Sequence, residues 1–211
     1  MALSKIGTNS LEDLSVTSGK VANDGIGPNQ LNEAANYAFT GTVTGIPVGL
    51  QEVDYWHKTS GQSISADTQT VASGNWSRTT TRGFSKIGTG MTESSGVFTF
   101  PSTGIYSIIY HPYWNGFGSN GASDANYCAS NIQATINNSD YAGITAGVSI
   151  ASSNINPKVR YVENNTEAVF DVTDTSTHKV RFNVYIEHEN GTLSGSSNNI
   201  TYAIFKKLGD T

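Results

Sequence analysis

The side chains best suited to chemistry are scattered along this chain of 211 residues. No two of its four histidines have the spacing His-x-x-x-His, and they stand far apart, at His57, His111, His178 and His188. Ligands of a metal ion must meet in space, and short fixed spacings are their usual signature in a sequence. The histidine pattern therefore predicts no metal site.

Carboxylates are the other source of metal ligands. Asp124, Asp171 and Asp174 fall in stretches that have the composition of loops, and they could present oxygen ligands to calcium. The ligand spacing of an EF-hand loop is absent from the sequence, so we expect these aspartates to be solvated loop carboxylates.

Nucleophilic catalysis is not indicated either. The chain has no Gly-x-Ser-x-Gly elbow and no glycine-rich phosphate loop before a helix. Cys128 is the only cysteine, so no intrachain disulfide can form, and no activating base stands near it in the sequence. Two carboxylates shared between subunits could still cleave glycosides, because such a pair needs only closeness in space. We expect no enzymatic activity and no cofactor.

One segment has the composition of a binding surface. Residues 112–118 have the sequence Pro-Tyr-Trp-Asn-Gly-Phe-Gly. Aromatic rings beside Asn and Gly suit stacking on sugar rings or insertion into a partner's pocket. Tyr113, Trp114 and Phe117 are therefore the candidate receptor contacts. The alternative is that these three side chains cap one end of a β-barrel and serve stability alone.

The composition favours β-structure and excludes two classes of partner. Charged residues make up 14% of the chain, below the roughly 25% of an ordinary soluble domain. Glycine, serine, threonine and asparagine separate the apolar runs, which is typical of many short strands. The net charge is −5 without a basic cluster, so we expect no nucleic-acid partner. No apolar run approaches the roughly 18 residues of a membrane span, so we expect no membrane insertion.

The stretch from Gly96 to Tyr110 organises the predicted fold. Phe98 and Phe100 stand two residues apart, so they share one face of a strand. Pro101 removes a hydrogen-bond donor and Gly104 permits a turn, which together end that strand.

The strand that follows Gly104 is apolar on both faces. One face carries Ile105 and Ile109, and the other carries Tyr106, Ile108 and Tyr110. A strand near the C-terminus, from Ile200 to Phe205, is also apolar on both sides and includes Ile200, Tyr202 and Ile204. Antiparallel strands with one solvated face should alternate between apolar and polar residues. We expect the domain's own core to cover one face and a second subunit to cover the other.

The chain divides into an N-terminal segment, residues 1–48, and a domain of residues 49–211. The segment is poor in apolar residues and cannot build its own core, although Pro28 to about Tyr37 favours a short helix. We expect it to anchor the domain through Leu11, Leu14 and Leu31. The cleanest strand pattern of the domain is Val180 to Ile186, where apolar and polar residues alternate.

Two resemblances bear on these expectations. Phe98, five residues, Gly104, then Tyr106, Ile108 and Tyr110 resembles the second half of the signature of complement-type globular heads. These heads are tumour necrosis factor-like jelly rolls, and they are trimers. The resemblance implies an all-β antiparallel jelly-roll sandwich that forms a homotrimer.

The second resemblance is narrower and lies in three patches. Lys86 to Pro101, the ending Phe-Lys-Lys-Leu-Gly-Asp-Thr from Phe205, and Ala38-Phe-Thr-Gly-Thr-Val-Thr-Gly are similar to small virion proteins of marine bacteriophages. They imply a structural protein of the virion that binds other virion proteins, in capsid or tail, through its N-terminal segment.

The place on the particle stays open between two roles. A capsid fibre or decoration protein fits the short anchor, and a receptor-binding tail fibre tip that recognises a host surface glycan fits the aromatic segment. A secreted trimeric binding module is disfavoured, because Met-Ala-Leu-Ser-Lys lacks the apolar core of a signal peptide. We therefore expect synthesis in the host cytoplasm and localisation in the virion.

Overall fold

The structure is a computed structural model, and it describes residues 49–79, 83–117, 126–151 and 160–211. The predicted helix that starts at Pro28 and the anchoring leucines Leu11, Leu14 and Leu31 lie outside the described residues. Every element that the structure describes is a strand, and every strand pair in it is antiparallel.

One layer of the fold, here called the inner sheet, is built around β8 and β16 at its centre. Its strands follow the order β13-β8-β16-β1-β4, and β5 also pairs with β1. Their bounds are β13 Thr166–Val172, β8 Gly104–His111, β16 Tyr202–Gly209, β1 Val53–Lys58, β4 Trp76–Arg78 and β5 Lys86–Ile87.

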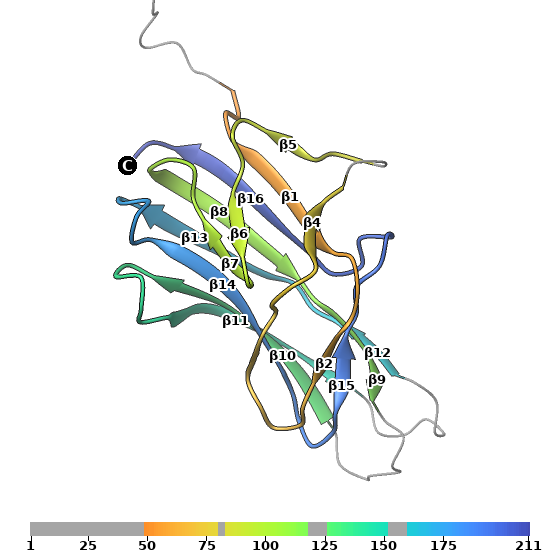
Figure 1. The fold of residues 1–211 in the computed structure, drawn as a ribbon. Coiled ribbons are helices and arrows are strands. Elements are labelled where there is room, and N and C mark those ends of the chain that lie inside the picture. Colours follow the sequence, from red (N-terminus) through yellow and green to blue (C-terminus); the bar gives the residue numbers. More distant parts are fainter. Residues whose placement is uncertain (1–48, 80–82, 118–125, 152–159) are drawn as a thin grey trace, which may run out of the picture. The chain divides into compact units, whose positions relative to one another are not determined.

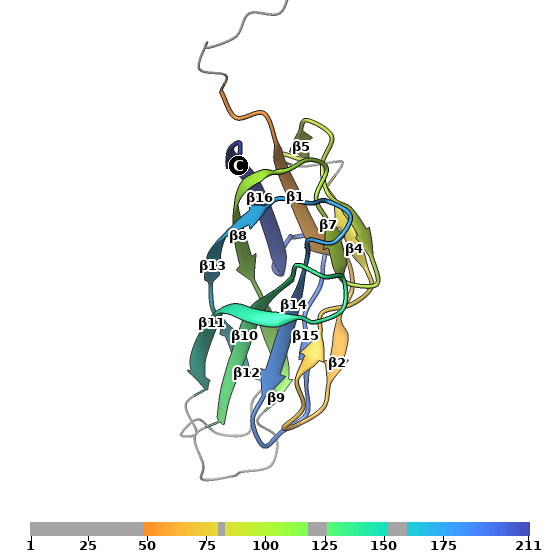
Figure 2. The same ribbon diagram turned by 90° about the vertical axis from the view of Figure 1, so that its left-hand side faces the viewer.

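The second layer, the outer sheet, packs on the first. Its order is β11-β10-β14-β7-β6, with β3 also paired to β14. In Figure 1, β6 and β7 lie in front of β8 and β16, and Figure 2 shows the same strands from the side. The bounds are β11 Ala142–Ala151, β10 Asn126–Thr135, β14 Lys179–Ile186, β7 Val97–Thr99, β6 Thr92–Ser94 and β3 Thr70–Val71.

A third, smaller sheet, here called the lower sheet, continues the inner sheet toward the bottom of Figure 1. It has the order β12-β9-β15-β2, with bounds β12 Arg160–Glu163, β9 Tyr113–Phe117, β15 Gly191–Leu193 and β2 Gln62–Ile64. Only Pro112 separates β9 from β8, so the two faces of β8 continue into β9. The strand order and the two packed layers confirm the predicted jelly-roll sandwich.

Aromatic side chains fill the space between the two sheets. Phe98 of the outer sheet is fully buried and lies 5.4 Å from the ring of Phe182 and 5.1 Å from that of Phe205. The rings of Tyr110 and Phe182 stack at 4.4 Å. Each such side chain contributes about 1.5–3 kcal/mol by burial, and each ring pair adds roughly 0.5–1.5 kcal/mol.

The two clearest strand predictions are confirmed. Phe98 and Phe100 both point into the core, and Val180, Phe182, Val184 and Ile186 of β14 are buried. The C-terminal strand starts two residues later than predicted, so Ile200 precedes it, and it runs on to Gly209.

Residues 142–151 form the strand β11. Gly147 lies opposite the buried Ser130, and Gly143 lies opposite Gln133 beyond a bulge. A Cβ on Gly147 would lie 2.6 Å from Cγ2 of Thr166, and one on Gly143 would lie 2.7 Å from Nδ2 of Asn131. A larger residue at either position would therefore require these neighbouring side chains to move.

Two buried carboxylates beside β1 hold the turn before β6. Asp54 accepts hydrogen bonds from Arg78 at 2.7 Å, from Nε1 of Trp56 at 2.8 Å and from the backbone N–H of Met91 at 2.6 Å. Glu52 accepts the N–H groups of residues 89 and 90 at 3.0 and 2.6 Å. This network anchors part of the Lys86–Pro101 patch to the domain.

Lys58 is also buried, on the side of β1 that faces the core. Its Nζ donates hydrogen bonds to Oε1 of Gln62 and to the carbonyl oxygens of Ser73 and Gly74, at 2.8 to 3.2 Å. Burial lowers the pKa of Lys58 to about 8. The three acceptors offset part of the cost of holding an ammonium group away from water.

Candidate functional site

The most distinctive surface of the described residues is the side of the inner sheet that faces away from the core. Tyr106, Ile108 and Tyr110 of β8 point into the core, so Ile105, Ile109 and His111 point outward. The strand register places Ile109 beside Ile204, and Ile204 beside Tyr55. We call the outward set the apolar face: Tyr55, His57, Ile105, Ile109, His111, Tyr202 and Ile204.

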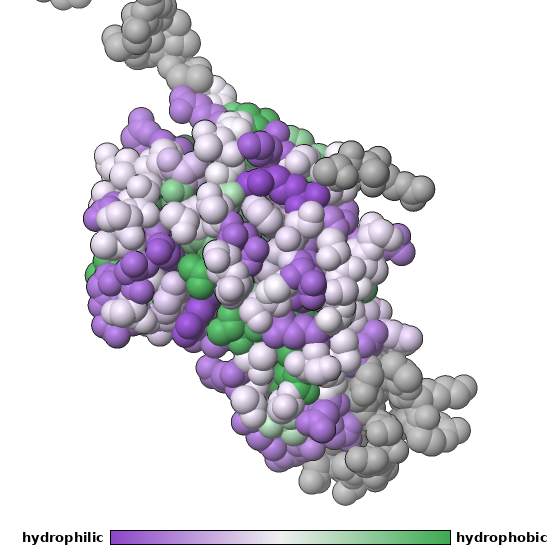
Figure 3. All heavy atoms as spheres, in the orientation of Figure 1, coloured by the Kyte–Doolittle hydropathy of each residue, from purple (hydrophilic) through white to green (hydrophobic). Residues whose placement is uncertain are grey.

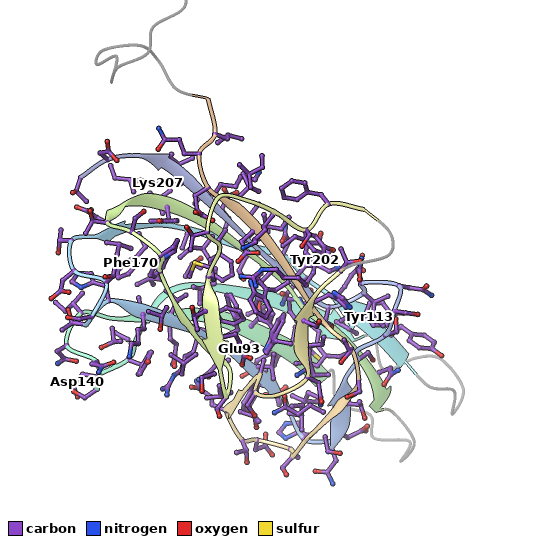
Figure 4. All side chains as sticks on the ribbon, turned by 45° about the horizontal axis from the view of Figure 1, so that its top comes forward. Glu93, Tyr113, Asp140, Phe170, Tyr202 and Lys207 are labelled. Atoms are coloured by element: carbon purple, nitrogen blue, oxygen red, sulfur yellow. The ribbon has the colours of Figure 1, made fainter. Side chains whose placement is uncertain are left out.

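Stacked rings cover one end of the apolar face. The ring of Tyr202 lies 5.4 Å from that of Tyr55 and 4.7 Å from that of His111, with interplanar angles of 20° and 18°. Figure 4 labels Tyr202 on β16. Burial, with a smaller contribution from Tyr202, raises the pKa of Tyr55 to about 12, so its hydroxyl is neutral at physiological pH.

Charges lie mainly at the margins of this face. Glu167 is opposite Ile109 and accepts a hydrogen bond from Ser107 Oγ at 2.9 Å. Glu163 lies with Oε2 3.4 Å from Nε2 of His111. Asp171 lies opposite Ile105, and Lys206 lies beside Ser107 on the central strand β16, two residues from Ile204. A largely uncharged sheet face with aromatic residues has the composition of the core of a subunit interface.

The structure divides the predicted strand residues between two surfaces. Tyr106, Ile108 and Tyr110 lie in the core, whereas the apolar face carries the others, Ile105, Ile109, Tyr202 and Ile204. Ile200 is half-buried ahead of β16. That a second subunit covers the apolar face remains a prediction.

The candidate receptor residues do not act as one group. Trp114 is fully buried in the core, as expected if this residue serves stability alone. Tyr113 points to the other side, and the side chain of Phe117 lies outside the described residues. A receptor contact through Trp114 would require its side chain to leave the core.

Tyr113 instead has an aromatic partner that sequence reasoning missed. Its ring lies 5.9 Å from the ring of Tyr161, which is 62% exposed, and Figure 4 labels Tyr113 on β9. The pairing of β12 with β9 brings them together, with Glu163 opposite Tyr113. No local pattern in the sequence around Tyr161 predicts that it lies next to Tyr113, because the two strands are far apart along the chain.

A second apolar patch, also missed, lies on the outer sheet. Ile144, Val148 and Ile150 project from β11 on its solvent side, and the last two are 61% and 74% exposed. Figure 3 views the outer sheet from the front and shows hydrophobic side chains in green over β10 and β11.

His178 and His188 have separate surroundings. His178 is buried between the hydroxyls of Thr173 and Thr177, and His188 lies on the surface near Asp67 and Glu187. Within residues 49–211, apart from the segments left undescribed, no three His, Cys, Asp or Glu side chains are grouped to hold a metal ion.

The three aspartates and the cysteine considered for chemistry differ in their surroundings. Asp174 accepts hydrogen bonds from the hydroxyl and backbone N–H of Ser176, which lower the pKa of its carboxyl. Asp171 is exposed on β13, and Asp124 lies outside the described residues. Cys128 is fully buried, and burial raises the pKa of its thiol to about 12, so the thiol stays protonated.

The described residues also contain no helix of the length and apolar character that crossing a membrane requires.

Comparison with known proteins identifies the fold. No protein-family model matches the chain, and no curated protein matches it. Among solved structures, Eiger TNF from S. frugiperda matches with a TM-score of 0.53 at 12% identity, over 75% of this chain and 93% of Eiger. The fold is tumour necrosis factor-like. Murine APRIL at pH 8.5 also matches, at 14% identity with a TM-score of 0.47, over 74% of this chain and 99% of that one.

The burial of Trp114 leads to a prediction about stability. Trp114→Ala should lower the free energy of unfolding by roughly 3–5 kcal/mol, because removal of the indole leaves a cavity in the core. Tyr161→Ala is the matched control and should cost at most about 1.5 kcal/mol, the value of one aromatic pair. Urea unfolding followed by circular dichroism measures both. Equal losses for the two variants would contradict the assignment of Trp114 to the core.

Proposed function

We propose that this chain is the homotrimeric knob of a bacteriophage virion structural protein, used as a capsid fibre or decoration protein. The observation that carries the trimer is the apolar face. An isolated knob would leave two tyrosines and three isoleucines of this face in contact with water. A subunit contact of standard size covers about 800 Å² per partner, and a sheet face of this kind suits it.

The threefold state rests on two likenesses. The Phe98–Tyr110 signature resembles that of trimeric globular heads, and the fold is tumour necrosis factor-like. The uncharged stack of Tyr55, Tyr202 and His111 supports tight packing, because few charges would have to be desolvated.

The virion role rests on the sequence patches that resemble marine phage proteins. One of them, Lys86 to Pro101, includes the turn held by Glu52 and Asp54, so it has a defined structural place beside β1. The segment of residues 1–48 supplies the attachment to the particle, because it is too poor in apolar residues to form a core of its own.

The trimer is tested by a charge on the apolar face. Ile109→Asp should convert the trimer into folded monomers, because each subunit would have to bury an unpaired carboxylate on assembly, at a cost of several kcal/mol. Ile136→Asp is the control, since Ile136 is 65% exposed in the turn after β10 and away from this face. Light scattering coupled to gel filtration gives the mass. A mass of one subunit for the unaltered chain would refute the trimer.

The anchoring role is tested by removing the N-terminal segment. A chain that begins at Pro47 should fold and assemble normally but should not join particles, because residues 56–205 already supply a buried apolar core. Incorporation is measured by antibody labelling and electron microscopy of particles, with the full chain as control. If the shortened chain aggregates or unfolds, the segment belongs to the core and is not an anchor.

A receptor-binding fibre tip is the second candidate, and the Tyr113–Tyr161 pair favours it. An exposed aromatic ring stacks on a sugar face at little entropic cost. If this role is correct, Tyr161→Ala should abolish binding to host cells while the protein stays a trimer. Tyr127→Ala, on the outer sheet, should leave the binding unchanged. Unchanged binding by Tyr161→Ala would leave the capsid role.

A further inference from the structure

A lysine interrupts the apolar residues of β16. Lys206 follows Tyr202 and Ile204 at intervals of two residues, so its side chain points to the same side of the inner sheet. In the strand register Lys206 lies between Val53 of β1 and Ser107 of β8, and neither of these neighbours carries a charge. The surface that the proposed trimer buries therefore includes an ammonium group.

Lys206 has no acid partner among the residues that the structure describes. The ion pairs that lysine and arginine form in this part of the chain join Arg78 to Asp54 and Lys207 to Asp210. The acids that β13 presents on the same side of the inner sheet are Glu167 and Asp171.

These two acids point outward from the edge strand of the sheet. Glu167, Val169 and Asp171 are exposed and alternate with side chains that face the core, and Val169 is 63% exposed. Figure 1 shows β8 between β13 and β16. Two strand spacings, roughly 9–10 Å, therefore separate β13 from the strand of Lys206 within one copy.

A ring of three copies imposes a condition on this surface. A contact that is repeated by threefold rotation joins two different surfaces of the chain. If the β16 regions of three copies met one another, three ammonium groups would approach with no acid between them, which opposes assembly. A contact that brings an acid of the neighbouring copy to Lys206 avoids this cost.

The strand register indicates which acids are suited to that contact. Val169 lies opposite Ser107, and Ser107 lies opposite Lys206, so the three residues share one row across the sheet. Rotation about an axis that runs along the strands keeps each row at about the same height. Glu167 and Asp171 of the neighbouring copy, two residues on either side of Val169, then stand just above and just below Lys206.

We propose that Lys206 forms an ion pair with the β13 carboxylates, Glu167 and Asp171, of a neighbouring copy, and that this pair fixes how the copies fit together. The inference rests on the proposed trimer. Val169 packs against the apolar stem of Lys206, while the ammonium group reaches the carboxylates. Such a pair selects the partner surface more than it adds affinity, because the attraction offsets the cost of removing both charges from water.

Reversal of the charges on each side tests the pair. Lys206→Glu and the double variant Glu167→Lys/Asp171→Lys should each lose the trimer and give folded monomers, because like charges meet in both. The chain with all three changes should recover the trimer, since opposite charges meet again with their places exchanged. Light scattering gives the mass, and circular dichroism verifies folding. Lys179→Glu, on the outer sheet, is the matched control and should remain trimeric.

The outcomes separate this inference from the trimer itself. A mass of one subunit for the unaltered chain would refute the proposed trimer. If the unaltered chain is a trimer and Lys206→Glu is one as well, the ion pair is absent. A folded triple variant that stays monomeric would also overturn the pair.

A second measurement uses the unaltered chain and does not depend on any charge reversal. A carbodiimide joins a lysine amine to a carboxylate in contact with it, with loss of water. Mass spectrometry of the linked dimers and trimers should find peptides of Lys206 joined to peptides of Glu167 or Asp171. The monomeric Ile109→Asp variant should give no such product. An intact trimer without these joined peptides would show that the inference is wrong.

Discussion

The contact on which the structure depends is the aromatic packing between the two sheets, where Phe98 and Phe182 of the outer sheet meet Tyr110 and Phe205 of the inner sheet. Because side chains alternate along a strand, committing Tyr110 to this core also commits its neighbours on β8 to the opposite side. The apolar face is therefore a direct consequence of the core. A register slip of one residue would exchange the two surfaces and expose the tyrosines.

A second constraint is the set of charges enclosed beside β1. Asp54 and Glu52 accept hydrogen bonds from backbone and side-chain donors of the turn before β6, and Lys58 donates to carbonyl oxygens of the turn before β4. Asp54 has an ion pair with Arg78, and Glu52 and Lys58 have hydrogen-bond partners, which offset part of the cost of burying these charges. These contacts tie both turns to the edge of the inner sheet. They keep β1, and with it Tyr55 and His57, in a defined position.

Three surfaces of the domain have different compositions and suit different partners. The apolar face combines aromatic and aliphatic groups with few charges, which suits another copy of the chain. The Tyr113–Tyr161 pair, with Glu163 opposite Tyr113, lies where the same side of the sheet continues into β9, and it suits a ligand such as a sugar. The patch on β11 is aliphatic and faces away from the inner sheet, so a trimer built on the apolar face would leave it open. The domain can thus assemble and still present surface to other components.

The sequence alone determined the fold class and the pairing of residues on strand faces. The period of two in Phe98 and Phe100, and in Val180 to Ile186, was sufficient to place these side chains in a core, because alternation is a local property of the extended chain. The sequence could not show which strands become neighbours. Only the tertiary structure joined Tyr161 to Tyr113, buried Trp114, and paired β11 with β10. Those outcomes depend on contacts between residues distant along the chain, and local patterns carry no record of them.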